Sequence, residues 1–134
     1  MIIRERLLFD PECLHVEEIK NSRGPGNVLI VEIENEHVTE IFTGFGMRGV
    51  RAEQVAERTA KEVQEYLASD VPVGRHLADQ LLIPMALAGA GKFRTLSLTN
   101  HSNTNIEVLK QFLDVKITVA QIDRNDCKVE IRNA

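Results

Sequence analysis

The residues with the clearest chemical potential lie in the polar stretch from Asn100 to Glu107, which contains His101. Imidazole is partly neutral near pH 7 and can attack a phosphoryl group without a strong base. Thr104 and Glu107 have the spacing of a T-x-x-E capping box, which predicts that a helix starts three residues after the histidine. Free N–H groups at a helix start favour anions, so His101 would lie beside a phosphate-binding position. On spacing alone, a surface histidine without a catalytic role is the simpler interpretation.

A second segment, residues 75–91, is an apolar helix by its spacing, with a polar start and glycines at its end. Asp79 and Gln80 are unusual on a helix this apolar, because buried polar groups need partners. Pro84 inside the helix removes the donor that would satisfy the carbonyl of Gln80. That carbonyl is therefore a free acceptor near the proposed site, or the proline merely kinks the helix.

These two segments together carry a family resemblance. The sequence H-L-A-D-Q-L-L-I-P-M-A-L-A-G-A-G followed by H-x-x-T-N-I resembles the C-terminal part of the RNA 3'-terminal phosphate cyclases. The resemblance extends upstream through Gly24-Pro25-Gly26-Asn27, Phe42-Thr43-Gly44-Phe45-Gly46 and Ala52-Glu53-Gln54-Val55-Ala56. Members of this family are more than twice as long, so the resemblance implies that the chain is the rear portion of such an enzyme.

The resemblance implies a reaction and a set of residues. Cyclases of this family use ATP to convert an RNA 3'-phosphate end into a 2',3'-cyclic phosphate through a covalent histidine–AMP intermediate, and His101 stands at the position of that nucleophile. The ATP-contact segment is matched by His76, Leu77, Ala78, Asp79 and Gln80, with His76 where relatives often have tyrosine. Asp79 and Gln80 would contact ribose hydroxyls or the adenine edge, or serve only as structural hydrogen-bonding groups. Mg²⁺ or Mn²⁺ would arrive with ATP, and no carboxylate cluster in the sequence suggests a metal site.

Five further residues are candidates for contacts with phosphate or RNA. Asn103, Thr104 and Asn105 flank the expected helix start, and Lys92 and Arg94 lie near the start of a predicted strand. Scattered surface charge explains Lys92 and Arg94 equally simply.

Composition restricts the class of protein. The 134 residues are 43% hydrophobic and 27% charged, and the N-terminus is too charged for a signal peptide. The net charge of −4 argues against binding nucleic acid through bulk charge. Charge is uneven, however: residues 1–71 hold 8 basic against 14 acidic residues, and residues 72–134 hold 8 against 6. We expect a cytoplasmic protein without membrane contact, whose second half is the part that tolerates phosphate.

The periodicity predicts an α+β fold with a domain boundary before Pro72. In residues 1–71 we expect a hairpin of strands 28–34 and 37–42, a glycine loop at 43–49 and a helix at 52–67. In residues 72–134 we expect helices 76–88 and 104–113 and strands 93–98, 115–121 and 127–132. The resemblance implies that residues 1–71 are most of a small inserted α/β domain. It also implies that residues 72–134 are the last α-β-α-β-β repeat of a multi-repeat domain like that of cyclases and EPSP synthase.

Two alternatives to the catalytic interpretation remain open. Non-catalytic relatives act as ribosome-assembly factors, although these lack the histidine that this chain retains. The chain could also be an inert fragment, because helix 76–88 is apolar on nearly every side and needs cover on both faces. That cover would come from the missing N-terminal portion of the cyclase, from a second copy in a homo-oligomer, or from elements swapped between copies.

Overall fold

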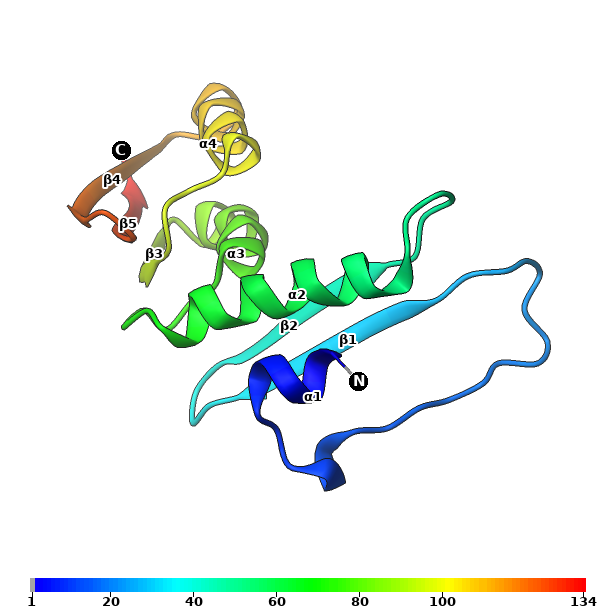
Figure 1. Cartoon of the computed structure of the whole chain (residues 1–134). Coiled ribbons are helices and arrows are strands. Elements are labelled where there is room, and N and C mark those ends of the chain that lie inside the picture. The colour runs from blue at the N-terminus through cyan, green and yellow to red at the C-terminus, as the bar shows by residue number, and fades with distance from the viewer. Residues whose placement is uncertain (1) are drawn as a thin grey trace. The chain divides into compact units, whose positions relative to one another are not determined.

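The computed structural model describes residues 2–134 and contains helices and two small sheets, so the chain has the α+β fold class that its sequence predicts (Figure 1). It forms two compact units. The first comprises residues up to Asn35 together with Ile41–Leu67, and the second comprises Glu36–Glu40 together with Ala68–Ala134. The assignment of these parts as an inserted domain and a last repeat stays a prediction.

The first unit is a hairpin with one long helix. Its elements are α1 (Ile2–Leu7), a short 3-10 helix η1 (Pro11–Cys13), β1 (Val28–Glu34), β2 (Thr39–Phe45) and α2 (Ala52–Leu67). Side chains of the hairpin alternate in burial, as a strand with one covered face requires. The predicted helix over Ala52–Leu67 is confirmed, and it buries Val55, Thr59, Val63 and Tyr66.

The expected glycine loop at 43–49 is partly wrong, because β2 continues to Phe45. Gly44 is an inward-facing strand residue that lies against α2. A Cβ at Gly44 would clash with Thr59 and Val55, so glycine at this position allows the helix to approach the strand closely.

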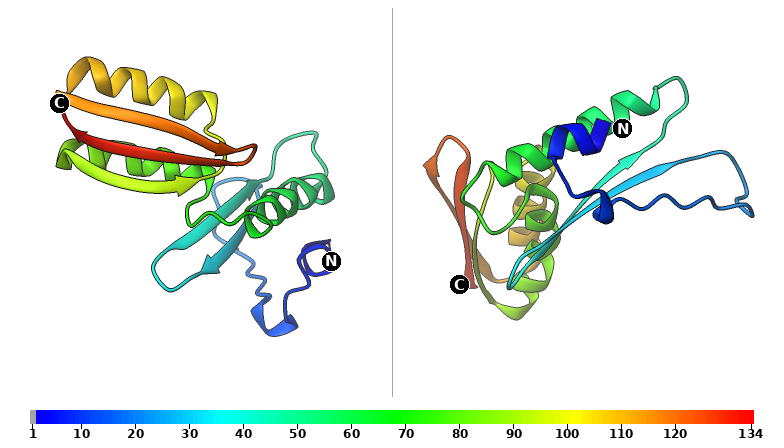
Figure 2. Two further views of the ribbon diagram at one scale, coloured as in Figure 1. Left: turned by 90° about the vertical axis from the view of Figure 1, so that its left-hand side faces the viewer. Right: turned by 60° about the horizontal axis from the view of Figure 1, so that its bottom comes forward.

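The second unit has two helices on one face of a three-stranded antiparallel sheet. Its elements are α3 (Arg75–Ala88), β3 (Ala90–Thr95), α4 (Asn100–Phe112), β4 (Val115–Asp123) and β5 (Asp126–Asn133), with strand order β3-β5-β4. The left view of Figure 2 shows the sheet toward the viewer with both helices behind it. One face of the sheet is thus covered, and the other is open to solvent.

The core of this unit lies between the sheet and the helices. It is built from inward-facing apolar residues: Val73, Ala78, Leu82, Ala86, Phe93, Ile106, Leu109, Ile117, Val129 and Ile131. Cys127 is also buried, on the same face of β5 as Val129 and Ile131. Ile83, Leu87 and Phe112 remain exposed on α3 and α4.

Two predicted boundaries in this unit are wrong. β3 spans 90–95 rather than 93–98, because Gly89 adopts φ 66°, ends α3 and leads the chain directly into the strand. α4 begins at Asn100 rather than at residue 104, so His101 lies inside the first turn of the helix and not ahead of it.

Candidate functional site

The start of α4 is set by Thr99 and not by the predicted capping box. The Thr99 side chain accepts a hydrogen bond from the Ser102 amide at 3.1 Å, and the two hydroxyl oxygens lie 3.0 Å apart. Ser102 is fully buried, which anchors this turn against the core. Thr104 lies within the helix, where its hydroxyl donates to the carbonyl of Asn100 at 2.9 Å. The amides that a helix start leaves unpaired are therefore those of Asn100 and His101, one turn earlier than expected.

The fold brings the two sequence segments together through Asp79. Nδ1 of His101 on α4 lies 2.9 Å from Oδ2 of Asp79 on α3. The other carboxylate oxygen of Asp79 accepts a hydrogen bond from Nδ2 of Asn105 at 3.4 Å. His101 and Asn105 are four residues apart on α4, so both side chains project from the same side of that helix. A single carboxylate on α3 thus connects to two residues on α4.

This arrangement leaves the imidazole anchored at one nitrogen and open at the other. The side chain of Asp79 is 24% exposed, whereas that of His101 is 80% exposed. When Nδ1–H donates to the carboxylate, the neutral ring carries its lone pair on Nε2. The ring can therefore act as a nucleophile or base toward a group in solvent while the carboxylate stabilises the positive charge that develops.

The predicted ATP-contact residues occupy the first turns of α3. His76 and Gln80 are exposed, Leu77 is half-buried beside the core and Ala78 is fully buried. Asp79 is the residue of this segment that meets His101. Nucleotide contact by these residues stays a prediction.

A buried carboxylate at the start of α3 was not anticipated from the sequence. Glu40 is only 2% exposed, and its carboxylate accepts a hydrogen bond from the backbone N–H of Gly74, the N-cap residue of α3. Burial raises the pKa of Glu40, while the Gly74 hydrogen bond and the nearby His76 act in the opposite direction. A signal existed in the sequence, since Glu40 falls in phase with the inward-facing Phe42.

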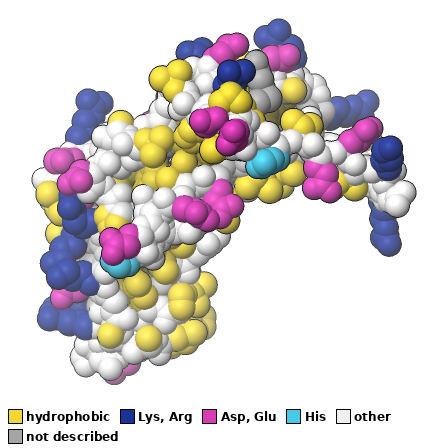
Figure 3. All heavy atoms as spheres, turned by 90° about the horizontal axis from the view of Figure 1, so that it is seen from below, with side chains coloured by type: hydrophobic (Ala, Val, Ile, Leu, Met, Phe, Trp, Pro, Cys, Tyr) yellow, Lys and Arg dark blue, Asp and Glu magenta, His cyan; other side chains and the backbone are white. Residues whose placement is uncertain are grey.

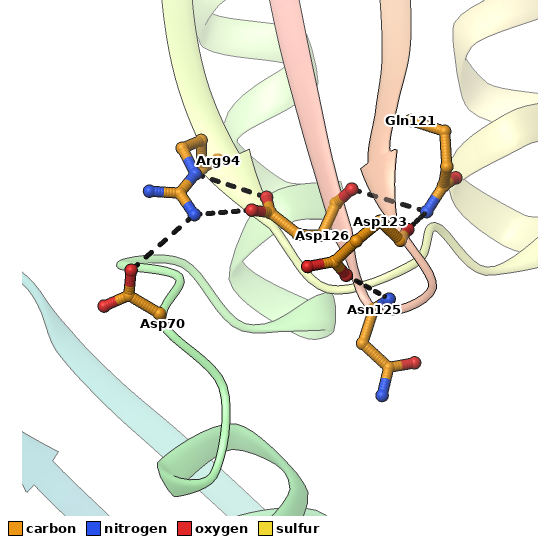
Figure 4. A network of polar contacts seen from close by, with 6 residues as sticks. All are labelled: Asp70, Arg94, Gln121, Asp123, Asn125 and Asp126. Carbon is orange, nitrogen blue, oxygen red and sulfur yellow. Dashed lines mark hydrogen bonds and ion pairs between the residues drawn. The ribbon is translucent and has the colours of Figure 1, made fainter.

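The predicted basic contacts do not converge with His101. Lys92 and Arg94 lie on β3, and their register places them on the face of the sheet opposite the helices. The Arg94 guanidinium bonds both carboxylate oxygens of Asp126, with Nε at 3.2 Å and Nη2 at 2.5 Å, and Nη2 lies 3.8 Å from Asp70 (Figure 4). The hydrogen bond to Asp126 raises the pKa of Arg94. Asn103 and Thr104 are exposed on α4.

The first unit contains a hollow of about 590 Å³. It is lined by the turn at Pro25–Asn27, by Gly46–Arg48, and by Val50, Ala52 and Val55. Arg48 is the one charged side chain of this lining, and no residue of the proposed site contributes to it.

Residues 2–134 contain neither a metal-binding cluster nor a membrane-spanning helix. Within residues 2–134, no three His, Cys, Asp or Glu side chains are arranged to hold a metal ion. None of the helices in that range combines the length and the apolar character needed to cross a bilayer.

Comparison with known proteins identifies close relatives. The profile of a family described as RNA 3'-terminal phosphate cyclase matches residues 12–119. Proteins named RNA 3'-terminal phosphate cyclase from Ralstonia nicotianae, Ectopseudomonas mendocina and Koribacter versatilis are 50%, 41% and 47% identical over 117, 130 and 111 residues. These matches cover 87%, 97% and 83% of this chain but 34%, 38% and 31% of the relatives. The chain thus spans about a third of the length of the curated relatives it matches.

Proposed function

Because the chain belongs to the RNA 3'-terminal phosphate cyclase family, we propose that it is the part of such an enzyme that carries the adenylated histidine, and that His101 is this residue. The observation that supports the proposal is the 2.9 Å contact between Asp79 and His101. It joins the two segments on which the family resemblance rests, and it leaves Nε2 of an exposed imidazole available for attack.

The proposed reaction proceeds in three displacements. Nε2 of His101 attacks the α-phosphorus of ATP, so that an N–P bond forms and the bond to the departing pyrophosphate breaks. An oxygen of the RNA 3'-phosphate then attacks the same phosphorus, takes the AMP and frees the imidazole. Finally the neighbouring 2'-OH loses its proton and attacks the activated 3'-phosphorus, which closes the cyclic phosphate and releases AMP.

The residues around His101 have separate roles in this proposal. Asp79 orients the ring and stabilises the cationic imidazole that forms when Nε2 is adenylated. Because both oxygens of Asp79 already have partners on α4, contacts with the nucleotide fall to the exposed side chains of His76 and Gln80. The metal ion would be held chiefly by the phosphates of ATP, as is usual for Mg²⁺ at nucleotide sites.

We also propose that the complete reaction requires the remainder of the protein, because the matched relatives are about three times longer. Exposed Ile83, Leu87 and Phe112 provide apolar surface that this remainder, or a second copy, would cover. An experiment on function should therefore restore the full length.

The proposal is tested with a chimera in which this chain replaces the matching third of the Ralstonia relative. After incubation with α-labelled ATP and a divalent metal, we expect a covalent AMP adduct in the parent chimera and none after His101→Ala. His37→Ala is the matched control, since His37 is an exposed histidine that lies 3.7 Å from the exposed Glu36, and it should retain the adduct. Persistence of the adduct in His101→Ala would show that another residue is the nucleophile.

A further inference from the structure

The open face of the three-stranded sheet collects most of the basic residues of the second half of the chain. In the register of β3, β5 and β4, Arg94 lies opposite Lys128, Lys92 opposite Glu130, and Lys116 opposite Arg132. Residues directly opposite each other share a face, so these side chains all point away from the helices. Figure 3 shows Lys and Arg side chains gathered along its left-hand edge, on the side where Figure 1 draws the sheet. We call this surface the basic sheet face, defined by Lys92, Arg94, Lys116, Lys128 and Arg132.

One end of the basic sheet face is neutralised by the protein itself. Arg94 is held by Asp126, and Lys128 Nζ lies 3.4 Å from Glu130 Oε2 (Figure 4 shows the first pair). Both carboxylates belong to β5, the central strand. The charges at this end are thus explained by the architecture of the sheet.

The other end of the basic sheet face is not neutralised. Lys116 and Arg132 lie directly opposite each other on β4 and β5, and Lys92 lies in the adjacent row, opposite Glu130, whose carboxylate pairs with Lys128. Within residues 2–134, none of these three side chains forms an ion pair with an acidic residue. Like charges directly opposite on a sheet are destabilising. An anionic ligand between Lys116 and Arg132 would relieve this repulsion.

The shape and chemistry of the face favour an extended ligand. The rows of Lys116 and Lys128 are four strand residues apart, which corresponds to about 13 Å along the sheet. Phe93, the aromatic residue of β3, points into the core, and the five residues that define the face include no aromatic ring. Bases therefore have no stacking platform, and the available contacts are with phosphates.

We propose that the basic sheet face binds the sugar-phosphate backbone of RNA, independently of base sequence, through Lys92, Lys116 and Arg132. The charges on the sheet indicate a polyanion, and only its identification as RNA rests on the proposed function. The proposed contact region is the sheet face that points away from α3 and α4, and His101 lies on α4, so the region would bind RNA away from the reacting 3' end.

The test measures binding of the 134-residue chain to fluorescent oligouridylate and oligoadenylate of about twelve nucleotides. The variant Lys116→Gln/Arg132→Gln should raise Kd about tenfold for both RNAs and reduce the salt slope of log Kd by about 1.4, as expected when two phosphate contacts to a single strand are lost. The control Arg58→Gln/Lys61→Gln removes the same charge from exposed positions on α2 and should leave Kd and slope nearly unchanged. Arg132→Lys should retain most of the affinity.

Several outcomes would overturn this inference. Equal weakening in the α2 control would mean that only net charge matters, and a strong preference for one RNA would mean that bases are read. Binding to phosphatidylserine vesicles with the same dependence on Lys116 and Arg132, and none to RNA, would identify a lipid surface instead. The thermal midpoint of the double variant should not fall, because the change removes a like-charge pair, so misfolding is detected separately. His101→Ala should bind RNA normally, so that failure of the proposed function leaves this result interpretable.

Discussion

Two carboxylates of the second unit each meet a nitrogen-bearing partner, and the two pairs differ in what they leave exposed. The side chain of Asp126 on β5 is only 8% exposed, and its two oxygens bond the Nε and Nη2 atoms of Arg94. Asp79 on α3 is 24% exposed and holds one nitrogen of a ring that is itself 80% exposed. In the first pair both carboxylate oxygens bond the guanidinium, whereas in the second the Nε2 atom of the imidazole has no partner within residues 2–134.

This difference separates a structural pair from a chemically competent one. A guanidinium has no lone pair to offer, and its hydrogen bond to Asp126 keeps it protonated by raising its pKa further. An imidazole bonded at Nδ1 still presents a lone pair at Nε2. We therefore expect substitutions at Asp79 to affect chemistry more than stability, and substitutions at Asp126 to do the reverse.

Asp79→Ala is expected to have the largest effect on the rate of the reaction. Loss of the acceptor frees the imidazole to rotate and to populate the tautomer with its proton on Nε2, so the rate of AMP-adduct formation in the chimera should fall about 100-fold. The thermal midpoint of the 134-residue chain should change little, because the carboxylate is partly exposed, His101 is a surface group and the hydrogen bond from Asn105 is long, at 3.4 Å.

Asp79→Asn provides the matched control, since its amide oxygen can still accept from Nδ1 and should restore part of the rate. Nitrogen chemical shifts of the His101 ring report the tautomer directly. If Asp79→Ala retains both the parental rate and the parental tautomer, the carboxylate does not position the nucleophile.

Asp126→Ala should give the opposite result. It leaves Arg94 without its bidentate acceptor beside the turn between β4 and β5, where Asp123 caps the backbone N–H of Asn125 at 2.8 Å and Gln121 contacts the Asp126 carbonyl (Figure 4). We expect the thermal midpoint to fall by about 5 °C and adduct formation to persist at temperatures below the transition. A loss of adduct formation in a folded Asp126→Ala chimera would remove the distinction between the two pairs.

Glu40 extends the comparison to a carboxylate that accepts a hydrogen bond from a backbone amide, that of Gly74. Glu40→Ala leaves the N–H of Gly74 buried without its acceptor and opens space beside it, so the free energy of unfolding should fall by about 2 kcal/mol. Glu40→Gln keeps an acceptor oxygen and should be tolerated. Chemical denaturation of the three proteins makes this comparison.

The pH dependence of stability gives Glu40 a second, independent readout. Its pKa is raised above 4.5 in the folded state, so the folded state releases this proton less readily than the unfolded chain. The stabilisation that comes from keeping Glu40 protonated in the fold is complete at a pH below the pKa of Glu40 in the unfolded chain. It is lost as the pH rises through the pKa of Glu40 in the folded state. The wild-type chain should therefore lose stability relative to Glu40→Gln between acidic and neutral pH, and parallel curves would contradict the burial of this carboxyl.

The sequence predicted those features that depend on local periodicity. The helix over Ala52–Leu67 has one apolar stripe and a proline soon after its end, and its bounds are as predicted. Cys127 alternates with Val129 and Ile131, and all three are buried. In each case the residues that form the pattern lie within one short stretch of the chain.

Features that depend on distant partners could not be predicted in this way. Glu40 is stabilised by Gly74, which lies 34 residues later, and Asp126 pairs with Arg94 across two strands. The contact between Asp79 and His101 requires α3 and α4 to pack side by side, which periodicity alone does not specify. The family resemblance anticipated that these two segments act together, but it did not indicate which atoms meet.

The start of α4 gives the smallest expected effect, and it tests how His101 is held. Thr99 and Thr104 are both followed three residues later by a polar residue, so the sequence offers two possible helix starts, and the structure uses the first. Thr99→Ala should lower the free energy of unfolding by about 1 kcal/mol, because it removes the acceptor for the Ser102 amide. Thr104→Ala removes only a hydroxyl that donates to a carbonyl within the helix and should change stability by less than about 0.5 kcal/mol.

Since His101 lies between Thr99 and Ser102, fraying of this turn should also weaken the bond between His101 and Asp79. Thr99→Ala should therefore slow adduct formation modestly, whereas Thr104→Ala should not. Equal effects of the two substitutions would mean that the first turn does not hold the imidazole in place.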